Sequence, residues 1–367
     1  MAEIKPNSEI NDIRTPSEFR SYSFSKYKKT MVVQKLVDAM QKIKIEPACY
    51  WAAELVCAGH YMDLWEIFLQ YAGRHIHLGN PKIIKYLEMR YQIFRNIMQK
   101  GHYTSELQLR NNATIRKLFA EIVVILSYSN RKHSLIAMQI DREEEFDLTQ
   151  IREKLVAPSS EYAESFFKKE DPREIFIALN EFAYSIEINR RNMRDACYWI
   201  EWLIDFDILC RKRKEPLFCE RRSIAELVEG KLQTDVIWML WEILISKSVE
   251  RGTFIESLMR SLLTLFCIKY TSAASKRRRF LLYFAVALLT DPVPTGIEIT
   301  TKKEIVEVVT NRIDDIYKQI KQNEINPNMD YLYSNLEQEV NLEKSLRKIE
   351  MMNTMNIIPS MSQEENI

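Results

Sequence analysis

The stretch "IEPACYWAAE" occupies residues 45–54, and its central string "ACYW" occurs again at residues 196–199. A second string that contains tryptophan, "LWEI", stands at residues 64–67 and 240–243, downstream of "ACYW" both times. Because the chain of 367 residues has only six tryptophans and six cysteines, two such strings rarely recur in one order by chance. The pattern predicts two copies of one unit. The alternative is that two unrelated core segments share these strings by coincidence.

The two copies differ by an insertion. Ala48 and Ala196 are 148 residues apart, whereas Leu64 and Leu240 are 176 residues apart, so the second copy holds 28 additional residues. These include "RKRKEPLFCERRS" at residues 211–223. A weaker third match, "ATIRKLFAEIVVIL" from residue 113 and "ASKRRRFLLYFAVALL" from residue 274, keeps the same order. Additions to a repeated scaffold usually lie in surface loops.

The chain is expected to be helical. It has seven glycines, far below the usual share of about 7%, and therefore few sites for turns with positive φ. In the first half, apolar spacing and capping residues predict helices from Thr30, from Pro47 to Gly59, from a capping Asp63 to Gly73, from Asn80-Pro81 to Gly101, and over residues 112–128. The first of these should bury Val33, Leu36, Val37, Met40 and Ile43. In the second half, helices are expected after Asp171-Pro172, at the second "ACYW", at residues 280–289 and over residues 302–322.

These signals predict an all-α protein of two pseudo-repeated multi-helix domains packed in tandem. The acidic stretch "DREEEFD" at residues 141–147 and "APSS" at residues 157–160 interrupt the helical periodicity and mark the connection. The expected order is a polar leader over residues 1–25, a first repeat over 26–145, a connection over 146–165, a second repeat over 166–325 with a basic insertion near 205–232, and a tail over 326–367.

Charge and cysteine usage limit the surroundings in which the chain works. Lys plus Arg number 52 and Asp plus Glu number 51, so no global field draws the chain to nucleic acid or membrane. The six cysteines form no CxxC pair, and the N-terminus has no signal peptide, which favours buried, reduced thiols. The longest apolar run, "FLLYFAVALL", has ten residues and is too short to span a bilayer. We expect no membrane insertion.

No catalytic signature occurs in the sequence. Gly-rich phosphate loops, GxSxG, HExxH and paired-carboxylate motifs are absent, so we expect no catalytic residues, cofactor or metal, although an enzyme with scattered residues would leave no motif. His60, His75 and His77 could gather a metal, because His75 and His77 are close in sequence. Histidines at a helix end more often bond backbone carbonyls, and we favour that interpretation. The six tryptophans recur with Leu and Ile at helical spacing, which favours core packing over a ligand site.

Basic clusters are the strongest candidate site. Cations gather at residues 26–29, at 190–194, in the insertion and at 276–279, mostly near expected helix ends. Six cations in the twelve residues 211–222 are dense enough that we expect them to face solvent or a polyanion. Arginine beside exposed tyrosine or phenylalanine also stacks on single-stranded bases. The alternative is ordinary solvated turns. The candidate residues for binding nucleic acid or a partner are Arg211, Lys212, Arg213, Lys214, Arg221, Arg222, Lys276, Arg277, Arg278 and Arg279.

Residues 30–100 resemble the helical collar of clamp-loader-type ATPases of DNA replication. In that collar, a helix that contains Tyr-Trp is followed by a glycine and then by a helix that begins with Asn-Pro or Asp-Pro. The matching features are Tyr50, Trp51, Gly59, Gly79 and the Asn80-Pro81 pair. In that family the collar holds subunits together, which implies assembly rather than chemistry. The chain departs from the family in having no P-loop lysine motif and no partner acidic box, so the motor is missing.

The whole chain is also similar to an uncharacterised protein of large nucleocytoplasmic DNA viruses, with "IEPACYW", "AGHY" and "HLGNP" as the shared signature. This resemblance implies a non-enzymatic assembly or adaptor protein in viral DNA replication, repair or transcription. The alternative is a structural protein of the virion. Either role implies viral protein partners, with nucleic acid and a homo-oligomer left open, and a location in the viral factory of the host cytoplasm or in the virion.

Overall fold

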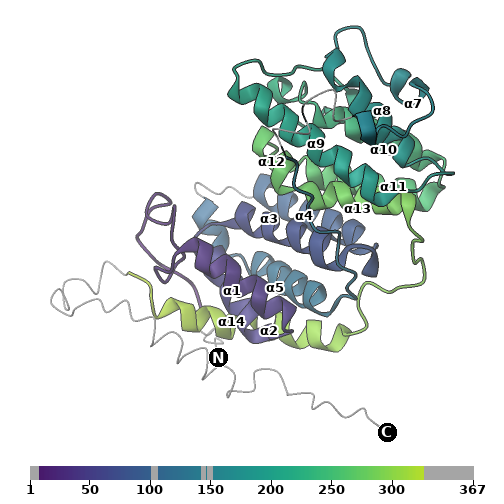
Figure 1. Ribbon diagram of the computed structural model, residues 1–367. Helices are drawn as coiled ribbons and strands as arrows, with labels where there is room; N and C mark the ends of the chain where they lie inside the picture. Colours follow the sequence, from purple (N-terminus) through teal and green to yellow (C-terminus); the bar gives the residue numbers. More distant parts are fainter. Residues whose placement is uncertain (1–7, 101–105, 142–145, 147–151, 326–367) are drawn as a thin grey trace, which may run out of the picture. The chain divides into compact units, whose positions relative to one another are not determined.

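The computed structural model describes residues 8–100, 106–141, 146 and 152–325 (Figure 1). Within these residues the regular structure is helical, and the only paired extended residues are Tyr22 and Lys28, which form an isolated bridge. The all-α fold class is therefore confirmed. The expected tail over residues 326–367 and residues 147–151 of the expected connection lie outside the described part of the chain.

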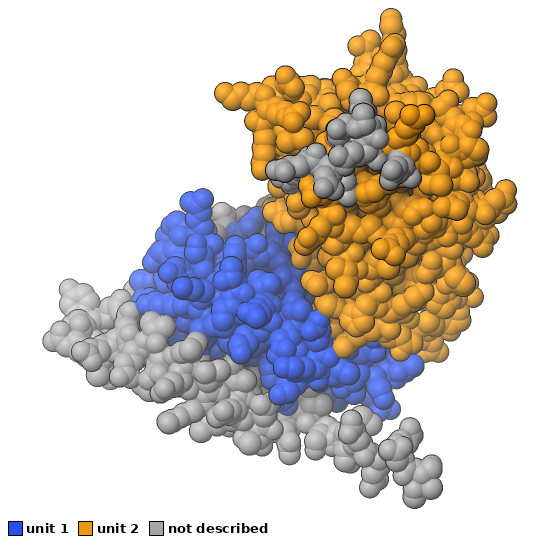
Figure 2. All heavy atoms as spheres, in the orientation of Figure 1, with its two compact units in different colours: residues 1–68, 89–129, 299–367 blue, residues 69–88, 130–298 orange. Residues whose placement is uncertain are grey.

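The chain divides into two compact units (Figure 2). Unit 1 holds Met1–Phe68, Met89–Ser129 and Ile299–Ile367, and unit 2 holds Leu69–Glu88 and Asn130–Glu298. The units differ from the expected repeats in two places. The last expected helix belongs to unit 1, and the segment from residue 69 to residue 88 belongs to unit 2. Sequence neighbourhood alone therefore does not determine membership of a unit.

Unit 1 is a bundle around the first "ACYW" helix. Its helices are α1 (Lys29–Gln41), α2 (Ile45–Cys57), α3 (Tyr61–Tyr71), α4 (Ile83–Lys100), α5 (Ala113–Tyr128) and α14 (Lys303–Lys321), of which α3 and α4 continue into unit 2. The helix α2 packs against both α1 and α5. Trp65 of α3 contacts Phe94 and Phe119 with ring centroids 5.9 Å away in each case, so aromatic packing joins α3, α4 and α5.

The boundaries of α2 follow from its sequence. Pro47 lies in its first turn, where a missing backbone N–H is tolerated. Gly59 adopts φ +78° just after the helix, and the N–H of His60 reaches back to the carbonyl of Leu55 at 2.9 Å. This is the hydrogen-bond pattern of a Schellman cap, which usually needs glycine at the left-handed position. The expected helix from Pro47 to Gly59 is confirmed to within two residues.

The helix α14 packs on α5 and α2, although α5 ends at residue 128 and α14 begins only at residue 303. Its buried residues share one face, as its sequence spacing requires: Val309, Ile313, Ile316, Tyr317 and Ile320. An amphipathic helix must cover an apolar surface, but its own pattern does not say which one. This explains why the last expected helix lies in unit 1 and not with the rest of residues 166–325.

Unit 2 is built around the second "ACYW" helix. Its helices are α7 (Glu161–Glu164), α8 (Phe176–Ser185), α9 (Met193–Lys212), α10 (Ile237–Val249), α11 (Thr253–Phe266), α12 (Ser272–Arg277) and α13 (Arg279–Thr290). The helix α9 packs against α8 and α13, and α10 packs against α11. The expected apolar run is α13, whose residues 281–290 are all buried. All six tryptophans of the chain are at most 5% exposed, which confirms that they are core residues.

The two units share packing relationships that the duplication predicts. The "ACYW" helix packs between the preceding helix and the later apolar helix in both cases, as α1–α2–α5 and as α8–α9–α13. The tryptophan of "LWEI" meets an aromatic ring of the next helix in both cases, Phe94 for Trp65 and Phe266 for Trp241. These parallels agree with two copies of one unit, and the duplication itself stays a prediction.

Two local expectations are wrong. Asp63 is not the N-cap of α3 but lies in its first turn, where its carboxylate is 2.9 Å from Nζ of Lys29. Ile43 is not on the buried stripe of α1. It follows the helix with φ +55° and is 44% exposed, because the N–H of Lys44 closes the helix end on the carbonyl of Ala39 at 2.9 Å. A left-handed cap therefore turns its side chain away from the core.

Candidate nucleic-acid interface

The structure separates the ten candidate cations into free and engaged groups. Those exposed without an ion pair among the described residues are Lys212, Arg213, Lys214, Arg221 and Arg277. The other five bond to carboxylates or backbone carbonyls: Arg211, Arg222, Lys276, Arg278 and Arg279. All ten lie in unit 2. Only the first group has positive charge available for another molecule.

The C-terminal end of α9 presents three of the free cations. Lys212 ends the helix, Arg213 caps it, and Lys214 adopts φ +64°. The N–H of Glu215 bonds the carbonyl of Cys210 at 3.0 Å, which closes a Schellman-type end. Cations at this end complement the partial negative charge of the helix dipole, so the end of the helix favours them. The local fold holds three cationic side chains at one turn.

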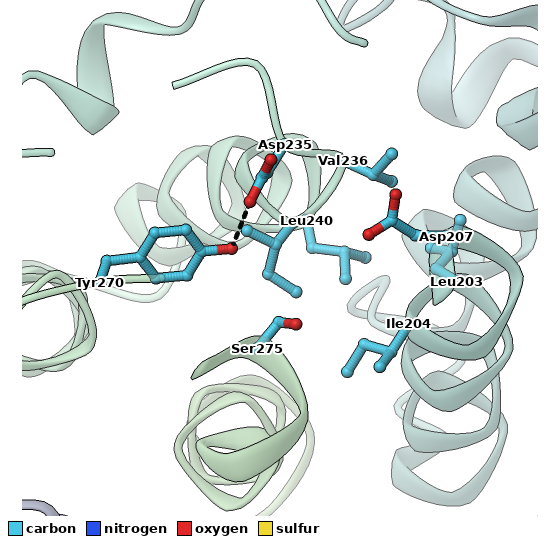
Figure 3. A pocket seen from close by; sticks show the side chains of 9 residues that line it. Leu203, Ile204, Asp207, Asp235, Val236, Leu240, Tyr270 and Ser275 are labelled. Atoms are coloured by element: carbon cyan, nitrogen blue, oxygen red, sulfur yellow. Dashed lines mark hydrogen bonds between the residues drawn. The ribbon is translucent and has the colours of Figure 1, made fainter. Parts of the chain in front are cut away.

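Arg211 is held by two acids and is not free. Its Nε lies 2.9 Å from Oδ2 of Asp207, and its Nη2 lies 2.9 Å from Oδ1 of Asp235. Tyr270 donates its hydroxyl to the other oxygen of Asp235 at 2.9 Å (Figure 3). Burial raises the pKa of Asp207 against the opposing effect of Arg211. These groups edge a cavity of about 10 Å³, which has room for one water molecule at most, so it is not a ligand site.

Arg222 contradicts the expectation that the cations of the insertion face solvent. Its side chain is fully buried, with Nη2 2.5 Å from Oδ2 of Asp171. Its Nη1 also donates to the carbonyl of Glu220 at 2.9 Å, and its second Nη2 bond reaches the carbonyl of Phe166 at 3.1 Å. A buried charge is tolerated only when it is paired and hydrogen-bonded, and Arg222 meets both conditions. These bonds hold the insertion to the segment that contains Phe166 and Asp171.

The cluster at residues 276–279, whose four cations are candidate binding residues, is mostly engaged in internal bonds. Arg278 is 4% exposed and donates to the carbonyl of Phe266 at 2.6 Å. Arg279 lies 2.9 Å from the buried carboxylate of Glu201, and Lys276 lies 3.0 Å from Asp205. Burial raises the pKa of Glu201, whereas the charge of Arg279 and a hydrogen bond from Tyr283 lower it. The two ion pairs join α12 and α13 to α9, and the Arg278 bond reaches the end of α11. Of these four cations, Arg277 alone has no such bond to another described residue.

Two large apolar side chains of the insertion are exposed. Phe218 is 59% exposed and Leu227 is 65% exposed. Phe218 directly precedes the buried Cys219, whose N–H bonds the carbonyl of Thr234 at 2.8 Å, so the backbone beside the ring is held in place. Phe218 is not among the residues predicted from the sequence, although its position between the basic run at residues 211–214 and the pair at residues 221–222 was a usable signal.

A second group of cations lies at the other end of α9. Arg190 and Arg194 border a cavity of about 560 Å³ together with Lys154 and Tyr198. The sequence identified residues 190–194 as basic but did not connect them with Lys154. Tyr198 is partly exposed, whereas both of its neighbours in the chain, Cys197 and Trp199, are buried.

The three candidate histidines each make a different contact. His75 lies beside His133, with the two Nδ1 atoms 3.3 Å apart, and His77 stacks on Phe284 at 4.8 Å. His60 bonds the carbonyl of Tyr22 through Nε2 at 2.9 Å, in unit 1. Among the described residues, no three His, Cys, Asp or Glu side chains are placed to hold a metal ion. The six cysteines are all buried and free.

Comparisons with known proteins add no relative. No protein-family model, no curated protein and no solved structure matches this chain. Within the described residues, no helix has both the length and the apolar character that crossing a bilayer requires.

Proposed function

We propose that this protein is a non-enzymatic assembly or adaptor protein that binds single-stranded nucleic acid through the insertion of unit 2. The similarity to a protein of large nucleocytoplasmic DNA viruses and to a replication-associated collar supports a role in viral DNA replication, repair or transcription. Viral proteins are the expected partners, in the viral factory of the host cytoplasm. The proposal assigns no reaction and no cofactor to the chain.

One observation supports the binding proposal most directly. The insertion places unpaired Lys212, Arg213 and Lys214 at one helix end, with Arg221 also free and the ring of Phe218 exposed. Unpaired cations contact phosphates without first breaking an internal ion pair, and releasing counterions favours binding. An exposed aromatic ring stacks on bases of any sequence. Cations and an aromatic ring in one segment are what a single strand requires.

The test removes the free cations and keeps the structural ones. The variant Lys212→Ser, Arg213→Ser, Lys214→Asn preserves Arg211 and Arg222, and asparagine tolerates the positive φ of residue 214. Binding of a fluorescent oligothymidylate, followed by anisotropy over a series of salt concentrations, should weaken. The slope of log K against log salt should fall by about 2 if all three cations contact phosphates of a single strand. Phe218→Ser should weaken binding without changing this slope.

The matched control removes the same charge from unit 1. Lys35, Lys44 and Lys117 are exposed and have no ion pair among the described residues. The variant with serine at all three positions should bind oligothymidylate like the unaltered protein. Equal weakening in both triple variants would mean that overall charge, not the insertion, governs binding. If the unaltered protein does not bind oligothymidylate at low salt, the nucleic-acid proposal is wrong and only protein partners remain.

The partner class is testable separately. Affinity purification of the tagged protein from infected cells, followed by mass spectrometry, should recover replication, repair or transcription proteins. Recovery of capsid proteins instead, together with abundance in purified particles, would favour the virion structural role.

A further inference from the structure

The cavity at the start of α9 is large enough for a small molecule. Its volume of about 560 Å³ lies within the roughly 300–1,000 Å³ typical of ligand pockets. Its walls come from three separate segments of unit 2, which are residues 138–139, residues 154–156 before α7, and residues 190–199 at the start of α9. The lining residues are Met138, Gln139, Lys154, Val156, Arg190, Arg194, Asp195, Tyr198 and Trp199. A pocket built from distant segments exists only in the folded unit.

The charge around this cavity is positive. Three cations line it, Lys154, Arg190 and Arg194, against one acid, Asp195. The Asp195 carboxylate is already satisfied, with Oδ2 3.0 Å from Nη2 of Arg190 and 2.5 Å from Nδ2 of Asn192. Arg194 is exposed and has no ion pair among the described residues. The N-terminal dipole of the twenty-residue α9 adds to this field. A ligand with an anionic group would match the positive charge of these lining residues.

An aromatic and apolar wall lies beside these cations. Lys154 Nζ is 4.4 Å from the ring centroid of Tyr198 and 3.1 Å from its hydroxyl. Tyr198 meets Trp199 edge to face, with centroids 5.0 Å apart and an angle of 79° between the ring planes. Trp199 is 1% exposed and also lines the cavity. A ligand that fits this wall has a flat, partly apolar group next to its anion.

Hydrogen bonds hold two of the segments that line the cavity in place. The backbone N–H groups of Val156 and Ala157 both donate to the buried carboxylate of Glu181, at 3.0–3.1 Å. The N–H of Asn192 donates to the carbonyl of Ser185 at 2.8 Å, and its side chain caps α9 by accepting from the N–H of Asp195 at 3.1 Å. Both walls are therefore positioned before any ligand arrives, which lowers the entropic cost of binding.

The geometry points to a nucleotide-binding site at the start of α9, where Arg194 and Lys154 hold a phosphate and the ring of Tyr198 contacts a planar base. Phosphate recognition by arginine and lysine and base contact with tyrosine are the interactions that these side chains make best. The nucleotide is either free or the terminal unit of a strand. This site lies at the opposite end of α9 from the insertion, so it does not depend on the nucleic-acid surface proposed above.

Calorimetric titration of the full chain tests the site. Adenosine 5′-monophosphate should bind more tightly than adenosine, which lacks the anion, and than ribose 5-phosphate, which lacks the base. Arg194→Glu should weaken binding of the monophosphate about tenfold or more, since a charge-assisted bond is replaced by repulsion. Tyr198→Leu should bring the affinities for the monophosphate and ribose 5-phosphate toward each other. The base contact is lost for the monophosphate alone, whereas loss of the bond between Lys154 and the Tyr198 hydroxyl affects both ligands.

Two controls separate this site from other basic residues. Arg191 is exposed and neighbours the cluster but does not line the cavity, so Arg191→Glu should retain the affinity of the unaltered protein. The insertion variant at residues 212–214 should also bind the monophosphate normally, which distinguishes failure of this site from failure of the insertion surface. Circular dichroism and thermal melting verify that each variant is folded.

A comparison of oligothymidylates with and without a 5′-phosphate identifies the source of the nucleotide. A gain in affinity from the 5′-phosphate that disappears in Arg194→Glu assigns the site to a strand end, and no such gain assigns it to free nucleotides. No heat from any of the four common nucleoside monophosphates at millimolar concentration would overturn the proposal. Unchanged binding by folded Arg194→Glu would overturn it as well.

Discussion

The guanidinium of Arg222 lies 2.5 Å from the carboxylate of Asp171, and both side chains are fully buried. Asp171 also accepts the backbone N–H of Lys168 at 2.7 Å and that of Glu220 at 2.9 Å. On its other side, Nε of Arg222 lies 2.6 Å from the carboxylate of Glu242 in α10. One buried arginine thus ties the insertion to the chain before α8 and to α10. An internal ion cluster therefore holds the insertion, the segment that also carries the free cations.

Arg222→Ala should destabilise the protein by about 3–5 kcal/mol, because it leaves the buried Asp171 carboxylate without its cation. The free energy of unfolding from urea titration measures the effect. Arg221→Ala provides the matched control, since the adjacent side chain is exposed and unpaired and its loss should change stability by at most about 0.5 kcal/mol. Similar losses in both variants would mean that the buried pair contributes no more than a surface charge.

The fold was predictable where capping residues and apolar periodicity coincide. Asn112 accepts the N–H of Ile115 at 3.1 Å and opens α5 where the sequence places a helix start. Gly59 ends α2 for the same kind of local reason. The position of α14 was not predictable, because an apolar stripe specifies burial but not the surface that covers it. Helix identity is local information, whereas helix pairing depends on all the other apolar faces in the chain.

The candidate site was predictable only in part for a related reason. A run of cations indicates exposure unless acids from elsewhere reach it, and Asp171 is 51 residues from Arg222. Arg278 bonds a backbone carbonyl, which no sequence pattern reports. One usable signal was present in α9, where Glu201 and Asp205 are four residues apart and face Arg279 and Lys276. Acids on an otherwise apolar helix indicate that nearby cations are partners.

Gly79→Ala should destabilise unit 2 by about 1–3 kcal/mol or more through steric overlap alone. A Cβ at residue 79 would lie 2.6 Å from backbone atoms of residues 130–132, and the N–H of Lys132 is held by the carbonyl of Ile76 at 3.1 Å. Backbone held in this way cannot move aside cheaply. Gly296→Ala is the control, because its Cβ meets nothing within 4 Å, and it should be neutral or slightly stabilising. Thermal melting distinguishes the two, and equal melting temperatures would contradict the argument.

Trp51→Ala and Trp199→Ala should each cost about 3–5 kcal/mol, because each removes a buried indole and leaves a cavity. The two side chains are 3% and 1% exposed, and each belongs to a helix that packs on two others. Phe218→Ala removes an exposed ring and should change unfolding little. If either tryptophan variant melted like the unaltered protein, that residue would have to be reassigned from the core to a binding surface.

The stability of unit 2 should fall as the pH drops below the ordinary pKa of histidine. Burial lowers the pKa of His77 to about 4, whereas an unfolded chain has a value near 6.5. Between these values the unfolded state binds a proton that the folded state rejects, so the free energy of unfolding decreases as pH falls and is constant above the upper value. Near pH 5 the loss from His77 should be about 2 kcal/mol.

His77→Asn tests this origin of the pH dependence. Asparagine does not titrate and tolerates the φ of +47° at this position. The variant loses the contact with Phe284 and should be less stable at neutral pH, but its stability should depend less steeply on pH between about 4 and 6.5. Burial also lowers the pKa of the partly exposed His75 to about 4, so some dependence should remain. Urea titrations at a series of pH values measure both slopes, and parallel curves for the two proteins would exclude His77 as the titrating group.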